Sequence, residues 1–331
     1  MTENRTNIKT NVEASSIETD EKLAEIIRQT EEKNRIKMEK RAELARKFAW
    51  FRKITNTGIF NHLVLGILVV IWLIPILWLL VTSFSASTGI NIAHFFPQKW
   101  SLANYITLFL KPDSVCQYVK WFSNTLVIAI FTCIISSAFV LMVSYAMSCM
   151  RFKGRKFLMS FSLILSMFPG VLSMIAVYFV MKSIGLTNSH VGMIIVYSAG
   201  SGLGFLIAKG FMDTIPGSLR EAARLEGASE AVIFFRVVMP LSKPIIVYQI
   251  ICSFLVPWGD FVLAKLMLNS GKASDWTIAI GLYNMLQKSL VNSYFSIFCA
   301  GGVLVSIPIS ILFVIMQKFY VEGITGGAVK S

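Results

Sequence analysis

Charged residues are scarce in this sequence, and several long stretches have none. They make up 15% of the 331 residues, whereas apolar residues account for 55%. Cysteines are also few, and they lie mostly within or beside apolar runs, with no spacing typical of metal ligands: Cys116, Cys133, Cys149, Cys252 and Cys299. We interpret them as small buried apolar residues rather than a disulfide framework or a metal site. This composition indicates an integral membrane protein.

A nucleotide-binding motif is also missing. No G-x4-G-K-[ST] sequence occurs anywhere, and the G-x-G at 202–204 lies inside an apolar run with no strand before it. We therefore expect no ATPase site, no cofactor, no metal and no enzymatic activity in this chain. No early apolar run follows a short basic start, so we also expect no cleavable signal peptide.

The net charge of +13 is unevenly distributed along the chain. Between Lys33 and Lys53 stand nine Lys or Arg residues against two Glu. The basic residues flank apolar runs, so the positive-inside rule explains them more simply than nucleic-acid binding does. We expect residues 1–55 to form a charged cytoplasmic extension, partly helical or disordered, ahead of a membrane domain over 56–331.

Six apolar stretches predict six transmembrane helices, and the fifth is short: 63–81, 124–147, 157–181, 191–209, 245–259 and 296–316. With six spans, twenty-four of the 31 Lys and Arg residues fall on one side of the membrane, together with both termini. We therefore predict an all-α, multi-pass protein of the plasma (inner or cell) membrane with both termini in the cytoplasm. Short helices are expected near 102–110, and 266–288 is expected to be a polar outer loop that reaches an extracytoplasmic partner.

Two positions within the spans suggest a substrate path. Pro169-Gly170 lies in the middle of the third stretch, where it predicts either a broken helix lining a pathway or a simple kink. Asp260 ends the fifth stretch beside Trp258. A carboxylate there suggests an outer gate or a hydrogen bond to a polyhydroxy substrate. The alternatives are a residue already at the membrane interface, or one paired with Lys265.

The polar stretch over 211–243 interrupts the apolar runs. Ser218 precedes Glu221 by three residues, which is the spacing of a capping box at the start of a short helix. Gly227 stands where that helix would stop, and Ser229 can cap the next one. These signals predict a short helix across the cytoplasmic ends of two spans.

This stretch resembles the E-A-A-x3-G loop of ABC importer permeases, a loop that is followed about nine residues later by a hydrophobic-x-hydrophobic-Pro pattern. The positions that match are Glu221, Ala222, Ala223, Gly227 with the following Ala228, and Pro240. The resemblance implies a coupling helix that docks in a cleft on a cytoplasmic ATPase subunit. The alternative is an ordinary loop in which Glu221 only caps the helix.

The C-terminal tail over 318–331 is similar to that of carbohydrate-importer permeases of the maltose/maltodextrin type. Its matching positions include Gly323, Thr325, Gly327 and Lys330. The resemblance implies that the tail reaches between two ATPase subunits. The alternative is a floppy terminus.

Together these resemblances, which cover about 60–331, imply a type I permease subunit of a binding-protein-dependent sugar importer that works by ATP-driven alternating access. The implied partners are a second related permease, two ATPase subunits that hold ATP and Mg, an extracytoplasmic sugar-binding protein, and membrane lipid; no nucleic acid is expected. Alternatives are an ABC permease for another solute and an ion-driven secondary transporter, although spans two, three and six lack the charged residues that the latter usually carries. Neither the sugar nor the subunit that holds it follows from the sequence.

Overall fold

We describe the protein from a computed structural model that covers residues 32–33, 35–41, 43, 58–90, 94–200, 204–269 and 271–328. The chain divides into two units, 1–75 and 76–331, and the boundary falls at Pro75 inside helix α2 (Gly58–Ser83). Most of the expected extension over 1–55, and Lys330, lie outside the described residues. In the first unit the side chains of α2 from Leu63 to Pro75 are apolar and exposed, as in a helix that meets lipid.

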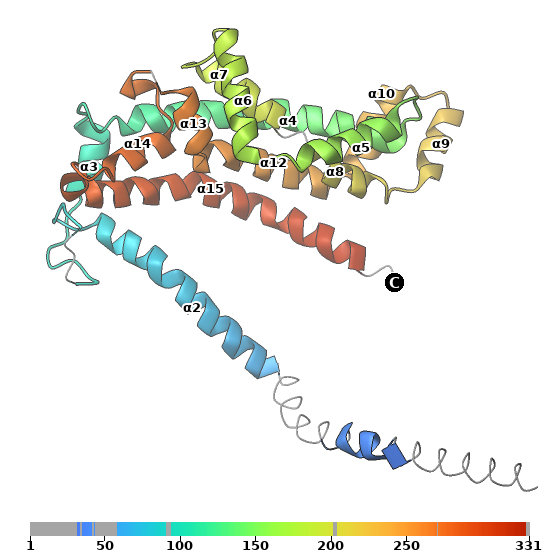
Figure 1. Cartoon of the computed structure of the whole chain (residues 1–331), viewed down its shortest axis with the longest axis horizontal. Helices are drawn as coiled ribbons and strands as arrows, with labels where there is room; N and C mark the ends of the chain where they lie inside the picture. Colours follow the sequence, from blue (N-terminus) through green and yellow to red (C-terminus); the bar gives the residue numbers. More distant parts are fainter. Residues whose placement is uncertain are drawn as a thin grey trace, which may run out of the picture. The chain divides into compact units, whose positions relative to one another are not determined.

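The described part of the second unit consists of helices, drawn in Figure 1. They are α3 (Ala103–Leu110), α4 (Tyr118–Cys149), α5 (Arg155–Ser166), α6 (Gly170–Ser183), α7 (His190–Gly200), α8 (Gly204–Met212), α9 (Gly217–Leu225), α10 (Glu230–Val232), η2 (Ile233–Val238), α11 (Met239–Leu241), α12 (Lys243–Gly259), α13 (Val262–Met267), η3 (Ala273–Asp275), α14 (Ile278–Met285) and α15 (Val291–Ala328).

Three of the described helices, α2, α4 and α15, are each long and apolar enough to cross a membrane. Three further spans result if each bent pair counts as one, and these pairs are α5 with α6, α7 with α8, and α10–α11 with α12. The six expected stretches coincide with these helices. The bend between α5 and α6 is 103° and falls at residues 167–169, so of the two alternatives for the third stretch the structure shows a broken helix.

Helix α4 is the centre of this unit and packs against α7, α8 and α12. Small or hydroxyl-bearing residues follow one another along its buried face: Thr125, Ala129, Thr132, Ser136 and Ser144. Inside a membrane the hydrophobic effect does not drive helices together, and small residues stabilise the packing by letting the helix backbones approach closely. The Ser144 hydroxyl contacts the carbonyl oxygens of Val140 and Phe205 at 2.6 and 3.0 Å, which fixes α8 against α4.

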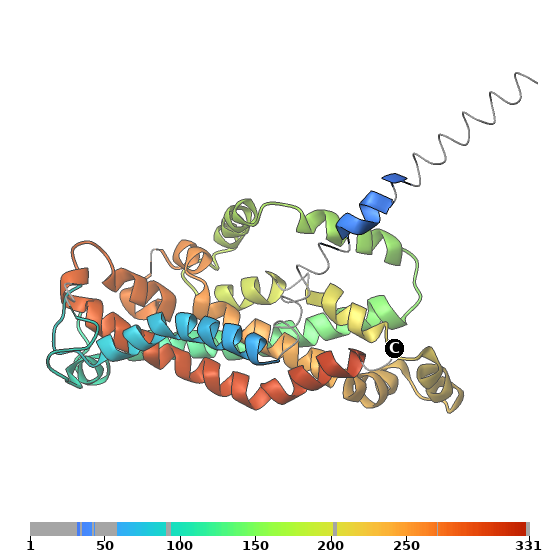
Figure 2. The same ribbon diagram turned by 90° about the horizontal axis from the view of Figure 1, so that it is seen from below.

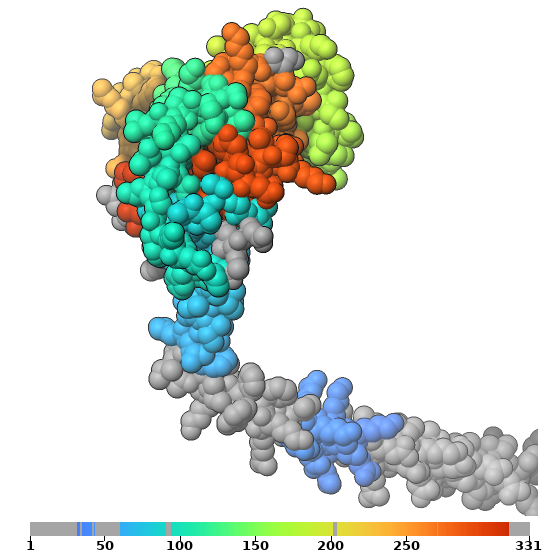
Figure 3. Space-filling view, turned by 90° about the vertical axis from the view of Figure 1, so that its left-hand side faces the viewer, coloured from blue at the N-terminus to red at the C-terminus, as the bar shows by residue number. Residues whose placement is uncertain are grey.

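The expectation of a polar outer loop over 266–288 was wrong. This segment folds into the end of α13, η3 and α14, and Met267, Ile278 and Met285 are fully buried. Its apolar residues are interspersed with polar ones, so they form no long run, yet they pack against α4 and its neighbours. Figure 3 looks onto this end of the second unit, where α3, α14 and the start of α15 meet. The expected helix near 102–110 is present as α3.

The close packing of α14 on α4 yields a first prediction. A Cβ atom added to Gly281 would lie 2.1 Å from Trp121 Cε3, and Trp121 is held in place because its Nε1 donates to the Ala273 carbonyl at 2.7 Å. We expect Gly281→Ala to destabilise the fold by at least about 1–3 kcal/mol. A thermal melt of purified protein in detergent measures this loss. Gly210→Ala, which meets open space in α8, is the matched control and should leave the melt unchanged.

Candidate functional site: an exposed loop helix and a cavity

The first candidate site is helix α9 and the turn that follows it. Pro216, with φ −54° and ψ 128°, occupies the N-cap position, and the helix begins at Gly217. The capping-box prediction was therefore wrong: Ser218 is the second residue of the helix, and no side chain caps its start. Proline at that position fixes the entry to the helix two residues earlier than the Ser-x-x-Glu spacing suggests.

The end of α9 matches the expectation. Gly227 has φ +81°, its N–H donates to the Arg224 carbonyl, and the Ala228 N–H donates to the Ala223 carbonyl, both at 3.0 Å. This pair of bonds defines a Schellman motif, in which glycine supplies the left-handed residue. Ser229 then accepts a hydrogen bond from the Val232 N–H and caps α10, as expected.

The motif residues divide between two faces of α9. Ala223 and Ala228 pack against a buried cluster that includes Met212 and Ile233. Glu221 and Ala222 are exposed, as is Pro240 in α11. Leu225, at 91% exposure, also projects from the helix. An exposed leucine beside small residues and a carboxylate is a surface suited to docking against another protein.

Two polar links lie on either side of α9 in the sequence, and neither was foreseen from the sequence. Glu230 accepts hydrogen bonds from the Tyr145 hydroxyl at 2.6 Å and from Arg224 Nε at 2.9 Å. Tyr145 belongs to α4, so this link joins the turn after α9 to the central helix. Its members lie up to 85 positions apart in sequence, and no periodic pattern connects them.

The second link centres on Asp213, which accepts from Ser148 Oγ at 2.6 Å and pairs with Lys209. Partial burial alone would raise the pKa of Asp213, but the bonds from Lys209 and Ser148 outweigh it and hold the pKa below its ordinary value. This carboxylate therefore stays charged at neutral pH, and it ties α8 to the end of α4.

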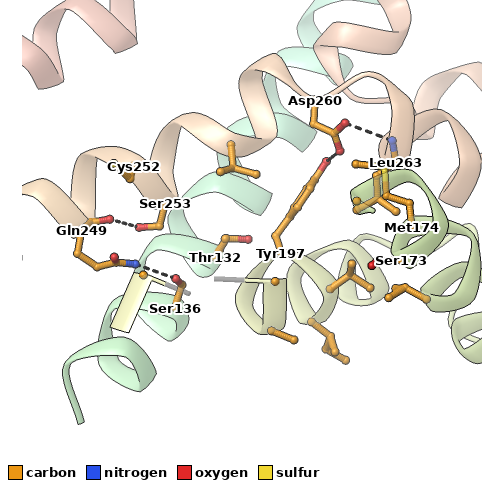
Figure 4. A pocket seen from close by; sticks show the side chains of 18 of the residues that line it. Thr132, Ser136, Ser173, Met174, Tyr197, Gln249, Cys252, Ser253, Asp260 and Leu263 are labelled. Atoms are coloured by element: carbon orange, nitrogen blue, oxygen red, sulfur yellow. Dashed lines mark hydrogen bonds between the residues drawn. The ribbon is translucent and has the colours of Figure 1, made fainter. Parts of the chain in front are cut away.

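The second candidate site is a cavity of about 810 Å³ among α4, α6, α7, α8 and α12 (Figure 4). Its wall is mostly apolar, and its polar groups come from Thr132, Ser136, Ser173, Tyr197, Tyr248, Gln249, Ser253 and Asp260. Gln249 Nε2 donates to Ser136 Oγ at 3.2 Å, and Ser253 Oγ donates to the Gln249 carbonyl at 2.6 Å. A large cavity with a few placed hydroxyl, amide and carboxylate groups suits a polyhydroxy ligand.

Asp260 lies in the wall of this cavity. Its carboxylate accepts from the Tyr197 hydroxyl at 2.7 Å and from the Leu263 N–H at 3.2 Å, as Figure 4 shows. These bonds join α7 to the turn between α12 and α13. Lys265, the alternative partner, lies instead over the Trp276 ring, 4.8 Å from its centroid.

The other expected path residues lie around the cavity in different ways. Trp258 is buried in a core cluster against Phe122 and Phe254, away from the cavity wall. Pro169 is the N-cap of α6, and the residues just after it, Gly170 and Ser173, line the cavity. Among the described residues, no group of three or more His, Cys, Asp or Glu is placed to hold a metal.

The tail positions continue the last helix. Gly323, Thr325 and Gly327 fall within α15, which runs without interruption to Ala328. In two perpendicular views, Figures 1 and 2, the C-terminal end of α15, helix α9 and the α4–α5 connection lie at one end of the second unit. The expected coupling and tail positions that the structure describes thus share that end.

A comparison with known families decides the identity. Residues 141–326, more than half of the chain, match the family of binding-protein-dependent transport system inner membrane components. The chain belongs to this family. In this family member the matched region runs from the last part of α4 into α15. It includes α9 and the cavity wall apart from Thr132 and Ser136.

Several proteins similar to this family member are sugar permeases by name. The galactooligosaccharides transport system permease protein GanQ of Bacillus subtilis is 35% identical over 274 residues, which is 82% of this chain and 95% of the relative. The maltodextrin transport system permease protein MdxG of the same organism is 34% identical, and the match covers 82% and 96% of the two chains. The maltose/maltodextrin permease MalG of Yersinia pestis is 36% identical over 64% of this chain and 70% of the relative. These relatives confirm the resemblance inferred from the sequence.

The fold agrees with a solved relative. A chain from a bacterial ABC transporter involved in the import of the acidic polysaccharide alginate superposes with a TM-score of 0.61. That match covers 82% of this chain and 97% of the other, at 14% sequence identity. A second structure of an alginate ABC transporter, in complex with a pentasaccharide-bound periplasmic protein, superposes with a TM-score of 0.56, at 14% identity and over 80% and 94% of the two chains. At this identity the likeness shows the fold.

Proposed function

We propose that this chain is a transmembrane permease subunit of a binding-protein-dependent ABC importer for oligosaccharides. The observation that carries the proposal is the combination of an exposed E-A-A-x3-G helix at one end of the bundle with a large cavity inside it. The relatives are named for maltodextrin, maltose and galactooligosaccharide transport, which supports a sugar as the cargo.

In the proposed topology each bent pair counts as one span, so the chain crosses the membrane six times with both termini in the cytoplasm. The excess of Lys and Arg on the side of α9 and the α4–α5 connection supports this orientation. The end of the unit that holds α9 then faces the cytoplasm, and the end with α3 and α14 faces outward.

The proposed assembly contains a second related permease, two cytoplasmic ATPase subunits and an extracytoplasmic sugar-binding protein. The ATPases bind ATP and Mg, and they dock on α9 through its exposed face. The tail beyond the last span is a further contact with them. Closure of the ATPases moves α9, and the links through Glu230 and Asp213 transmit that motion to α4 and α8. The bundle then alternates between inward- and outward-facing states.

Uptake measurements test this function. A strain that lacks the gene should lose binding-protein-dependent uptake of labelled oligosaccharides, and the intact gene should restore it. Maltodextrins and galactooligosaccharides are compared in parallel, because relatives of both kinds match the chain equally well. Uptake of both sugars at the parental rate in the deletion strain would contradict the proposal.

A second prediction concerns the Tyr197–Asp260 bond. If it holds the cavity wall closed on the outer side, then Asp260→Asn and Tyr197→Phe should each change the rate of uptake several-fold at unchanged protein level. A hydrogen bond to a charged group contributes about 1.5–3 kcal/mol, enough for such an effect. Asp260→Asn removes the charge of the acceptor and Tyr197→Phe removes the donor, so both variants act on the same bond and the double variant should show little further change. Additive effects of the two substitutions would show that the bond plays no part in the gate.

A further inference from the structure

A second polar cavity, of about 420 Å³, lies beside α9. It is lined by Ser148, Cys149, Arg151, Arg155, Gly217, Arg220, Glu221 and Arg224. Four of these eight residues are arginines: Arg151 from the α4–α5 connection, Arg155 from the start of α5, and Arg220 and Arg224 from α9. The transport proposal gives roles to Glu221, Ser148 and Arg224, and it leaves Arg151, Arg155 and Arg220 unused.

The arginines are only partly satisfied within the described part of the chain. Arg224 pairs with Glu230, its Nη2 lying 2.7 Å from Oε1, and Arg155 Nη1 donates to the Met150 carbonyl at 3.3 Å. Arg220 Nε is buried and has no hydrogen-bond partner among the described residues. A buried donor without a partner is costly, so the position favours an acceptor supplied from outside the chain.

The charge at the cavity is positive. Glu221 is the one carboxylate in its wall, and it forms no ion pair with any described residue. With Glu230 neutralising Arg224, the remaining three arginines and Glu221 leave an excess of two positive charges. The first residues of both α5 and α9, Arg155 and Gly217, also line the cavity, and helix N-termini add positive partial charge.

An apolar surface begins where the cavity ends. Helix α5 starts at Arg155, and Phe157, at 70% exposure, and Phe161, at 46%, lie on its exposed surface. Phe152, in the connection before the helix, is also exposed. The guanidinium groups of the cavity thus lie beside exposed aromatic rings. Together they form a site with one part for an anionic group and one part for an apolar chain.

We propose that this cavity binds the phosphate group of an anionic phospholipid of the cytoplasmic leaflet, whose acyl chains lie along α5. Guanidinium groups bind phosphate oxygens in paired hydrogen bonds, and Arg220, half-buried with an unpartnered Nε, can supply them. Basic pockets at the cytoplasmic ends of membrane helices are suited to anionic headgroups. The lipid would thereby hold α9 against the α4–α5 connection, next to Glu221. A soluble phosphate ion would form the same hydrogen bonds but would make no contact with the apolar surface of α5.

The test measures lipid binding to the full chain by native mass spectrometry in detergent. Phosphatidylglycerol is titrated against phosphatidylcholine, and inorganic phosphate is added in a separate arm. We expect the parent to bind phosphatidylglycerol at least tenfold more tightly than the double variant Arg151→Gln, Arg220→Gln does. Arg236→Gln removes an exposed arginine that lines no part of the cavity, so this control should bind as the parent does.

Each alternative result overturns the proposal. Equal affinity for phosphatidylglycerol in the parent and the double variant would show that the arginines do not form a lipid site. If Arg236→Gln loses as much affinity as the double variant, the effect is one of general surface charge. Displacement of lipid by millimolar inorganic phosphate assigns the cavity to a soluble anion. Unchanged lipid binding with loss of ATPase co-purification assigns it to an acidic protein surface. If the double variant does not fold, the lysine pair Arg151→Lys, Arg220→Lys keeps the charge, and parental affinity in that pair contradicts a role for the guanidinium fork. Sugar uptake is measured separately, so failure of the lipid site leaves the transport proposal standing.

Discussion

Glu221→Ala should abolish most sugar uptake while leaving the permease folded in the membrane. The Glu221 carboxylate is exposed and forms no ion pair with any described residue, so its loss breaks no salt bridge within the described part of the bundle. Its proposed role is a charged contact with the ATPase. Truncating one partner of a buried interfacial charge pair costs about 2–5 kcal/mol, which corresponds to a loss of roughly 30-fold or more in affinity. Co-purification of the ATPase and uptake of labelled sugar measure the effect.

Two controls separate this contact from local changes in the helix. Glu226→Ala removes an exposed carboxylate from the C-cap of the same helix and should leave uptake near the parental rate. Ser218→Ala should also be nearly silent, since Ser218 does not cap α9. Parental uptake in Glu221→Ala, or an equal loss in Glu226→Ala, would show that this position makes no specific contact with the ATPase.

Ser173→Trp should block uptake by filling the cavity. Ser173 lines the cavity from α6, one turn after the break at Pro169, and its hydroxyl donates to the Pro169 carbonyl at 3.4 Å. An indole adds bulk to a space of about 810 Å³ that the proposal assigns to a sugar. We expect at least a tenfold loss of uptake at an unchanged protein level, with the ATPase still bound.

The matched control is Ser166→Trp, at the end of α5 on the other side of the same break. Ser166 lies outside the cavity wall, and its hydroxyl donates to the Leu163 carbonyl at 2.6 Å. This variant places the same bulk on the same broken span, and it should transport as the parent does. If Ser173→Trp also transports normally, the substrate path does not pass through this cavity, and the partner permease would hold it instead.

Local signals in the sequence predicted the features that depend on local chemistry. Apolar run length located the helices and bent pairs that are long and apolar enough to cross a membrane, Pro169-Gly170 located the break between α5 and α6, and Gly227 located the end of α9. The start of α9 was misplaced because Pro216 controls the entry to the helix. The roles of Glu221, Asp260 and the tail remain predictions.

Contacts between distant segments could not be predicted in the same way. The Tyr145–Glu230–Arg224 link and the Tyr197–Asp260 bond each join different helices, and their geometry depends on how those helices cross. Helical periodicity gives the face on which a side chain lies but not the partner it meets. The buried α14 was missed for the same reason, since its eight residues form too short an apolar run to predict burial, and Ile278 and Ile280 are buried only by packing against other helices.

Because α15 is one continuous helix, the C-terminal tail moves together with the last span instead of moving independently of it. The helix is 38 residues long, which corresponds to about 57 Å at 1.5 Å per residue. A tilt of about 10° about its outer end would therefore swing the inner end by roughly 10 Å. A slack connector would absorb such a swing, whereas a stiff rod delivers it to whatever subunit holds its tip. In the proposed importer, a tilt of the last span would thus displace the tail at the interface between the two ATPase subunits.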